Sequence, residues 1–313
     1  MADRRKRKRA GRVRWPLLAG VAAAVVVGRK RRDLGLPPRV VLPLVAATPI
    51  ATATALPHGR LRAAAAWAVQ MWAYKVAFEL PYDDPERARE RLHIDYPIRA
   101  DSVLGAGEPP TARLQRRLRR PPSLSWLDRA AALFYFTWEA EPHAALLWIL
   151  CREPERFPAA AARLGAAFDL TLVGYYACPT APPWWASEYE GRMDRVVRRV
   201  VAEVAKELRG KPRPGLDHNA GANPWASMPS DHFGSAAMTA MLLSEISPVA
   251  GVLGWAYALT LGAVLVYTGE HYVTDLGAGL LLALGVRASA PLFAAPAGRV
   301  GAALSRLAPG FAG

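Results

Sequence analysis

The sequence has little cysteine, and its carboxylates are not grouped. Its 313 residues include only two cysteines, Cys151 and Cys178, which we expect at opposite ends of helices. The sequence therefore predicts neither a disulfide framework nor a thiolate metal site. No cluster of carboxylates accompanies the histidine motifs near the C-terminus, so we expect the chemistry to need no metal and no other cofactor.

Signatures of nucleic-acid binding are also absent, although the chain is basic. It has 40 Lys and Arg against 26 Asp and Glu, a net charge of +14. Such a charge suits either nucleic acid or an anionic membrane surface. The sequence shows no zinc-finger spacing and no nucleic-acid fold signature. Because 52% of the residues are hydrophobic and gather in blocks with basic flanks, we expect a membrane partner and no nucleic acid.

A cleavable signal peptide is not indicated at the N-terminus. A basic arm, Arg4–Arg9, precedes the apolar stretch Trp15–Gly28, but no small-residue cleavage site follows it. The stretch ends instead at the basic run 29–32, which favours an uncleaved anchor or a membrane-surface helix. The next apolar block, Arg39–Leu56, either spans the membrane or forms a shallow hairpin with Trp15–Gly28.

No internal repeat and no separate soluble domain is visible in the rest of the chain. Its apolar blocks have about the length that crosses a bilayer: Leu61–Leu80, Trp126–Leu150, Phe157–Cys178, the two halves of Phe233–Thr268, and Thr274–Ala288. Shorter amphipathic segments are typical of helices on the membrane surface: Glu86–Leu92, Thr111–Arg119 and Arg192–Arg209.

The sequence thus predicts an all-α, polytopic membrane helix bundle. It has a six-helix core, N-terminal apolar helices and interfacial amphipathic helices. We divide it into a basic arm with anchor helices (1–60), the membrane domain (61–295) and a C-terminal tail (296–313).

Polar residues inside the predicted spans have two interpretations. Lys75 and Glu79 are four residues apart and are expected to pair on one helical face. Glu139 and His143 also share a face, beside Pro142. They either line a substrate pocket or form an internal polar cluster at a proline kink.

Two histidine motifs flank the apolar block Phe233–Thr268. Met228-Pro229-Ser230-Asp231-His232 precedes it, and Gly269-Glu270-His271-Tyr272-Val273-Thr274-Asp275 follows it. Each half of the block is roughly 18 residues long, so two crossings return the chain to the side that it left. We therefore expect His232, His271 and Asp275 to lie close together at one membrane face.

These residue types suit phosphoryl transfer. Ser230 is a favoured N-cap, and the helix start behind it can hold a phosphate. Thr274 is expected to cap the last helix in the same way, and Gly277 and Gly279 to allow close helix contact. Asp275 lies four residues after His271, near enough to fix the imidazole tautomer and leave the other nitrogen as a nucleophile. His232 would then act as the general acid. Taken singly, each of these residues is also an ordinary polar residue at a helix end.

At these residues the chain resembles the type 2 phosphatidic acid phosphatase superfamily. The resemblance lies in Pro-Ser-Asp-His232 and His271-xxx-Asp275 around a transmembrane hairpin. The loop 181–185, Ala-Pro-Pro-Trp-Trp, and Met228 look most similar to the inositol phosphorylceramide synthase branch. The resemblance covers residues 125–290. It implies a six-helix membrane core and an extracytoplasmic site, with His271 as nucleophile, Asp275 as its partner and His232 as acid.

The chain departs from the superfamily pattern at two places. Val264-Leu265 stand where the phosphatases often carry Ser-Arg, and Asp231 replaces the usual Gly or apolar residue. The first phosphatase motif, Lys followed six residues later by Arg-Pro, is matched by Lys206 and Arg213-Pro214. These cations either clamp the phosphate together with Ser230 or match by accident in an arginine-rich segment. Glu270 is expected to be solvated.

The expected function is a membrane phosphatase or phosphotransferase that acts on a lipid phosphate or phosphodiester through a phosphohistidine. Its substrate is expected to be a phospholipid or a polyprenyl phosphate. Composition and resemblance indicate a multi-pass protein of a bacterial plasma membrane with an extracytoplasmic site, although the arginine-rich loops on the active face argue mildly for a cytoplasmic one. The alternatives are a catalytically silent transporter or scaffold with the same fold, and haloperoxidase chemistry.

Overall fold

The computed structural model describes residues 2–119, 123–209 and 223–307. Over these ranges the chain is 75% helical and contains no strand. Two isolated bridges join Thr180 to His93 and to Ala226. The predicted all-α fold is confirmed. Cys151 and Cys178 are both free.

The helices form two compact units that alternate along the chain. The first consists of Met1–Asp83, Leu146–Gly165 and Arg287–Gly313, and the second of Asp84–Ala145 and Ala166–Val286. The division that the sequence suggested, at residues 60 and 295, stays a prediction.

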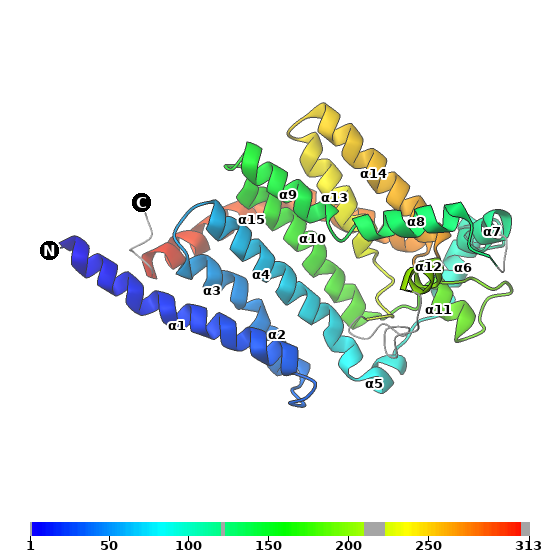
Figure 1. Ribbon diagram of the computed structural model, residues 1–313, viewed down its shortest axis with the longest axis horizontal. Coiled ribbons are helices and arrows are strands. Elements are labelled where there is room, and N and C mark those ends of the chain that lie inside the picture. Colours follow the sequence, from blue (N-terminus) through cyan, green and yellow to red (C-terminus); the bar gives the residue numbers. More distant parts are fainter. Residues whose placement is uncertain (1, 120–122, 210–222, 308–313) are drawn as a thin grey trace. The chain divides into compact units, whose positions relative to one another are not determined.

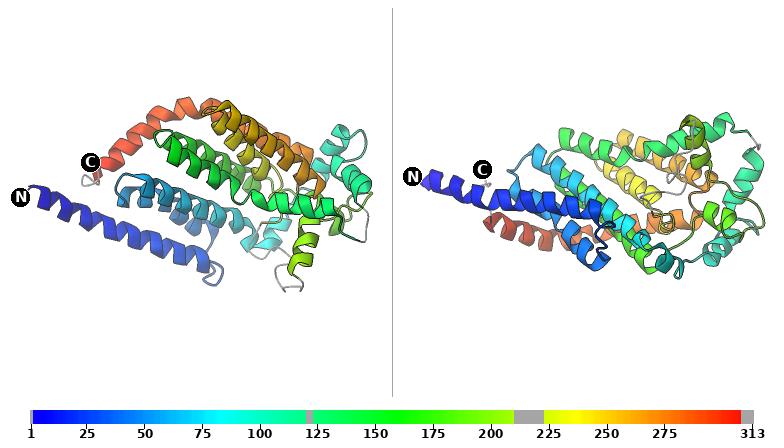
Figure 2. Two further views of the ribbon diagram at one scale, coloured as in Figure 1. Left: turned by 45° about the horizontal axis from the view of Figure 1, so that its top comes forward. Right: turned by 60° about the horizontal axis from the view of Figure 1, so that its bottom comes forward.

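The first unit contains the N-terminal apolar helices α1 (Ala2–Lys30), α2 (Pro38–Ala46), α3 (Thr48–Ala55) and α4 (Arg60–Glu79), followed by the 3-10 turn η1 (Leu80–Asp83). Helix α3 packs between α1 and α4, as the blue helices of Figures 1 and 2 show. Arg31 is buried and donates to Glu79 at 2.8 Å and to Asp83 at 2.7 Å. Lys75 and Glu79 pair at 3.2 Å, as predicted.

The second unit carries both histidine motifs. Its elements, some of which run on into the first unit, are α5 (Pro85–Arg89), α6 (Asp95–Leu104), α7 (Pro110–Leu118), α8 (Trp126–Thr137), α9 (Glu141–Arg152), α10 (Phe157–Ala177), α11 (Pro183–Glu188), α12 (Val200–Arg209), α13 (Asp231–Ser244), α14 (Pro248–Tyr267) and α15 (Val273–Leu307).

Three segments of the described chain are long and apolar enough to cross a membrane: Pro38–Ala55, Pro248–Tyr267 and Val273–Phe293. Four predicted spans are not among these segments. Leu61–Leu80 and Phe157–Cys178 form the long helices α4 and α10, which are less apolar than the three segments. The other two predicted spans differ in length or in continuity. Helix α13 has only 14 residues, fewer than the roughly 20 that a crossing needs. The block Trp126–Leu150 is two helices, because residues 138–140 form tighter i→i+3 bonds before Pro142, which has no N–H to donate.

The predicted surface helices are present with altered bounds. Helices α5 and α7 match two of them, and α6 was not predicted. The segment Arg192–Arg209 was wrongly predicted as helical throughout, since α12 begins only at Val200. Upstream of it, the N–H groups of Val197 and Arg198 donate to the side chains of Ser187 and Gln115, which holds this backbone outside a helix.

Helices α13 and α14 form the predicted hairpin and lie side by side in Figure 1. Ser247 caps α14 by accepting from the N–H of Ala250, and Pro248 suits the first helical position. The hairpin buries a core of Phe233, Ala236, Ala258, Leu261 and Leu265.

Side chains from α7 and α8 hold the end of α14. Thr111 donates to the carbonyl of Val266 at 2.7 Å, and Gln115 donates to that of Tyr267 at 2.9 Å. These carbonyls are among those that a helix end leaves without intrahelical partners. The Tyr267 hydroxyl donates to the buried carboxylate of Asp128 at 2.7 Å. The chain that leads into the second histidine motif is therefore fixed on both sides.

Glycines bring α13 and α15 into backbone contact. A Cβ on Gly279 would lie 2.3 Å from the carbonyl oxygen of Ser230, and one on Gly234 would lie 2.9 Å from that of Gly279. The close helix contact expected of Gly279 is confirmed. The same prediction is wrong for Gly277, where a Cβ would meet nothing within 4 Å.

We predict that Gly279→Ala destabilises the protein by about 1–3 kcal/mol, since backbone atoms must move to admit the methyl group. Gly277→Ala, two residues away on the same helix, is the matched control and should be neutral or stabilising by up to about 1 kcal/mol. Thermal unfolding in detergent measures both. Equal midpoints for the two variants would contradict the close contact.

Candidate active site

The first histidine lies at the start of α13. Ser230 caps this helix, as predicted, with its hydroxyl oxygen accepting from the N–H of Phe233 at 3.2 Å. His232 is therefore in the first helical turn, and its ring is partly exposed. This turn is the positive end of the helix dipole.

The second histidine lies between α14 and α15. Gly269 starts this junction with a φ of +82°, and a Cβ there would lie 2.8 Å from the carbonyl oxygen of Arg198. Only glycine fits both conditions. The turn carries the chain directly to His271, whose side chain is buried.

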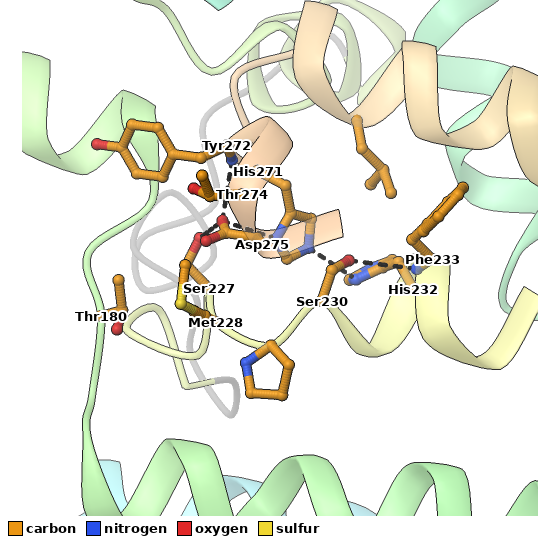
Figure 3. A network of polar contacts seen from close by, with 12 residues as sticks. Thr180, Ser227, Met228, Ser230, His232, Phe233, His271, Tyr272, Thr274 and Asp275 are labelled. Carbon is orange, nitrogen blue, oxygen red and sulfur yellow. Dashed lines mark hydrogen bonds and ion pairs between the residues drawn. The ribbon is translucent and has the colours of Figure 1, made fainter. Parts of the chain in front are cut away.

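Asp275 organises the start of α15. Its Oδ2 atom accepts from the N–H of Tyr272 at 2.9 Å and from the hydroxyl of Ser227 at 2.5 Å. The same atom lies 3.3 Å from Nδ1 of His271, as Figure 3 shows. The predicted contact between His271 and Asp275 is thus present, and the carboxylate is fully buried.

The two imidazoles meet. Nε2 of His271 lies 3.2 Å from Nδ1 of His232 (Figure 3). The Nδ1 atom of His232 also lies 2.9 Å from Oδ1 of Asp231, and its Nε2 lies 3.1 Å from the hydroxyl of Tyr135. The structure therefore brings together His232, His271 and Asp275, which the sequence placed at one membrane face.

Aromatic side chains of α8 and of the turn after it hold the ring of His232. The ring of Trp138 lies 4.0 Å from it, centroid to centroid, and that of Tyr135 lies 5.2 Å from it. The indole N–H of Trp138 donates to the hydroxyl of Ser235 at 2.9 Å. The sequence analysis did not single out Tyr135 or Trp138. Their spacing of three, on one face of a helical turn, was the available signal.

A partly buried ion pair involves Glu270, the residue before the second histidine. Arg199 pairs with Glu270 at 2.8 Å and lies over the ring of Trp184, 4.5 Å from its centroid. Burial lowers the pKa of Arg199, but the Glu270 carboxylate raises it by a larger amount. The net pKa is above the ordinary arginine value, so the guanidinium stays charged. The expectation that Glu270 is solvated is wrong, because the residue is 8% exposed.

Burial and a carboxylate act on His271 in opposite directions. Burial lowers the pKa of its imidazole, whereas the hydrogen bond and the charge of Asp275 raise it. The net effect is a pKa above the ordinary histidine value. The ring is therefore more basic than a free imidazole.

The other predicted site residues are those expected to bind the phosphate. Ser230 is fully buried and serves as the cap of α13. Lys206 is exposed in the last turn of α12. Arg213 lies outside the described residues. A phosphate clamp built from these three residues stays a prediction.

A buried aspartate from α6 holds the start of α15, and the sequence analysis did not single it out. Asp101 accepts from the N–H groups of Val273 and Thr274 at 3.0 and 2.9 Å, and from the Thr274 hydroxyl at 3.0 Å. Thr274 was expected to cap this helix. Instead it lies inside the first turn, and Asp101 supplies the cap.

One group of side chains has metal-ligand geometry. Asp231, His232 and His271 each offer one ligand atom, and these atoms lie within 4.8 Å of one another. The sequence predicted no metal, but it did not place the carboxylate of Asp231 beside both imidazoles.

The described residues define an all-helical protein with apolar helices of membrane-spanning length and a largely buried His–His–Asp site between helix ends. A family model described as the PAP2 superfamily matches residues 110–288. This match covers more than half of the chain, so the chain belongs to the PAP2 superfamily. Membership supports a phosphatase-type activity in general. No curated protein and no solved structure gives a significant match.

We predict that Asp101→Ala lowers stability by about 1–3 kcal/mol, because two partly buried N–H groups and a hydroxyl lose their acceptor. It should also lower activity, since the segment from His271 to Asp275 loses its anchor. Asp84→Ala is the control, because Asp84 caps the exposed helix α5 through a single backbone N–H of its own helix. Thermal unfolding and turnover of both variants test this. An Asp101 variant that behaves like the Asp84 variant would remove the anchoring role.

Proposed function

We propose that this protein is an integral membrane phosphatase or phosphotransferase that acts on a lipid phosphate or phosphodiester through a phosphohistidine. The observation that carries the proposal is the continuous line of contacts from Asp275 through His271 to His232. Membership of the PAP2 superfamily supports the general reaction class.

In the first step, Nδ1–H of His271 donates a hydrogen bond to Asp275, which leaves the Nε2 lone pair free. Nε2 attacks phosphorus, a P–N bond forms, and the bond from phosphorus to the leaving oxygen breaks. His232 gives its proton to that oxygen. In the second step, water or another hydroxyl attacks phosphorus, His232 takes its proton, and the P–N bond breaks.

The resting contact between the rings is too short for this reaction. A phosphorus between the nucleophile and a hydrogen-bonded leaving oxygen needs the two nitrogens on the order of 6 Å apart, and they lie 3.2 Å apart. The substrate must therefore part the rings. His271 is held by Asp275 and buried, whereas His232 is partly exposed. His232 is the ring that we expect to turn.

Transition-state charge would be stabilised by the first turn of α13, whose dipole end faces the phosphate. Lys206 and Arg213 are the further cations that we propose for this role. Ser230 is committed to capping through its oxygen, and its hydroxyl hydrogen is left to donate to a phosphate oxygen.

The finer assignment is to the inositol phosphorylceramide synthase-like branch. The loop that carries this resemblance packs beside the site, since the N–H of Trp184 donates to the carbonyl of Gly269 at 3.2 Å. We propose that a head group of a phospholipid or a polyprenyl phosphate enters between this loop and the histidines. The proposed location is a bacterial plasma membrane, with several spans and an extracytoplasmic site.

We expect His271→Ala and His232→Ala to abolish vanadate-sensitive release of phosphate or head group from labelled lipids, because each removes a reacting group. Losses of about 10³-fold or more are expected. His58→Ala, an exposed histidine of the first unit, is the control. Free phosphate as product indicates hydrolysis, and a new phosphodiester lipid indicates transfer. Unchanged activity in both site variants would favour a silent transporter or scaffold.

The pH dependence of Asp275→Asn tests the nucleophile. The Asp275 charge raises the pKa of His271, and attack needs the unprotonated ring, so kcat/KM falls as the pH drops through that pKa. Removing the charge lowers the pKa, and the acid limb moves to lower pH. The plateau should fall by roughly 10²- to 10⁴-fold, since an amide also stabilises the wrong tautomer. An acid limb that stays in place or moves upward would show that His271 does not set it.

A further inference from the structure

Asp231 adds a carboxylate at the point where the two histidines meet. Its Oδ1 atom lies 2.9 Å from Nδ1 of His232, and its side chain is 5% exposed. The superfamily that this motif resembles usually has glycine or an apolar residue at this position. The proposed reaction gives Asp231 no role, and a negative charge facing the phosphate would oppose substrate binding.

The three side chains have the spacing of a tetrahedral metal site. Zinc bonds of about 2.0–2.1 Å to nitrogen and oxygen place neighbouring ligand atoms about 3.3 Å apart. Nε2 of His271 and Nδ1 of His232 are separated by 3.2 Å, and Nδ1 of His232 and Oδ1 of Asp231 by 2.9 Å. The largest separation within the set is no more than 4.8 Å. Small side-chain movements bring all three atoms to one ion.

Each histidine is also held from behind, as metal-binding histidines usually are. The far nitrogen of His271, Nδ1, contacts Asp275, and the far nitrogen of His232, Nε2, contacts the hydroxyl of Tyr135. These contacts leave the two facing nitrogens as the ligand atoms. The contact between His271 and Asp275 has two roles, because it also orients His271 in the proposed reaction.

We propose that Zn²⁺ binds to Asp231 Oδ1, His232 Nδ1 and His271 Nε2, and that the bound ion switches the enzyme off. Two imidazoles and one carboxylate suit zinc, whereas Mg²⁺ prefers an all-oxygen shell. The positive end of the α13 dipole opposes a cation, and the Asp231 charge compensates for it. The fourth position is open to water or to a phosphate oxygen.

Protons balance in a simple way. In the ion-free site with a neutral ring, Nδ1–H of His232 donates to Asp231 and the Tyr135 hydroxyl donates to Nε2. Zinc takes the place of the Nδ1 proton, and the ring's single proton moves to Nε2 by exchange with solvent. The Nε2–H group then donates to the Tyr135 oxygen, whose own hydrogen turns away from the ring. The neutral ring therefore carries one proton before and after the ion binds, and binding to this state releases no net proton.

Inhibition follows from competition for one lone pair. Zinc on Nε2 of His271 occupies the electrons that would attack phosphorus. It also ties His232 to the same ion, which prevents the two rings from parting. This inhibitory effect rests on the proposed function, whereas zinc binding itself does not.

The test uses the full-length protein in detergent, without an affinity tag and stripped with a chelator. Zinc binding is measured by calorimetry and by elemental analysis, with Mg²⁺ as the comparison ion. Asp231→Asn and Asp231→Gly are the test variants, and Asp194→Asn, an exposed aspartate, is the control. We expect one zinc ion per wild-type chain and affinity at least about tenfold weaker in both Asp231 variants. Wild-type affinity in these variants, or no zinc binding in the wild type, overturns the proposal.

Activity and spectroscopy complete the test. The zinc concentration that halves each variant's own zinc-free rate should rise at least about tenfold on loss of Asp231, and a chelator should restore the wild-type rate. If the Asp231 variants fail to fold, Co²⁺ absorption of the wild type decides, since a tetrahedral site gives strong visible bands and an octahedral one does not. Zinc binding by a protein with no zinc-free activity would refute the enzyme assignment and leave the zinc site standing.

Discussion

One carboxylate oxygen, Oδ2 of Asp275, is the point on which the site depends. It accepts from the N–H of Tyr272 and from the hydroxyl of Ser227, and it contacts Nδ1 of His271. A fully buried carboxylate is costly unless such contacts compensate for its lost hydration. The contact that starts α15 and the contact that orients His271, the proposed nucleophile, are made by the same atom. The geometry of the helix start therefore fixes the tautomer and the direction of His271.

That helix start is itself held by parts of the chain that take no part in the chemistry. Asp101 of α6 binds the first N–H groups of α15, and Thr111 and Gln115 of α7 bind the last carbonyls of α14. Helix ends leave such groups without intrahelical partners, and here side chains from neighbouring short helices satisfy them. Helices α6 and α7 thus act as supports for the junction that carries His271. The burial pattern of α7 agrees, because its buried residues are Thr111, Ala112 and Gln115.

The sequence revealed what depends on local spacing and missed what depends on distant contacts. The Ser230 cap, the i,i+4 contact between His271 and Asp275 and the hairpin between the motifs all follow from short-range patterns. Asp101 lies 172 residues from Val273, and no local pattern distinguishes it from an exposed aspartate. The predicted start of α12 was wrong for a related reason. The valine periodicity from Arg192 onward is helical, but side chains of Ser187 and Gln115 bind the backbone N–H groups there.

The contact between the two imidazoles links catalysis to cation binding. Separated by 3.2 Å, the facing nitrogens lie at the edge length of a zinc tetrahedron and well short of the gap that a phosphoryl group needs. In the proposed reaction a substrate pushes the rings apart, whereas the proposed Zn²⁺ pulls them together. The charge of Asp231 favours the state with the rings together, because it attracts the cation and repels the phosphate. A neutral residue at this position would ease phosphate entry and remove a ligand. Asp231 therefore favours a resting state in which the two rings stay in contact. The rings part when the cation concentration falls or the substrate concentration rises.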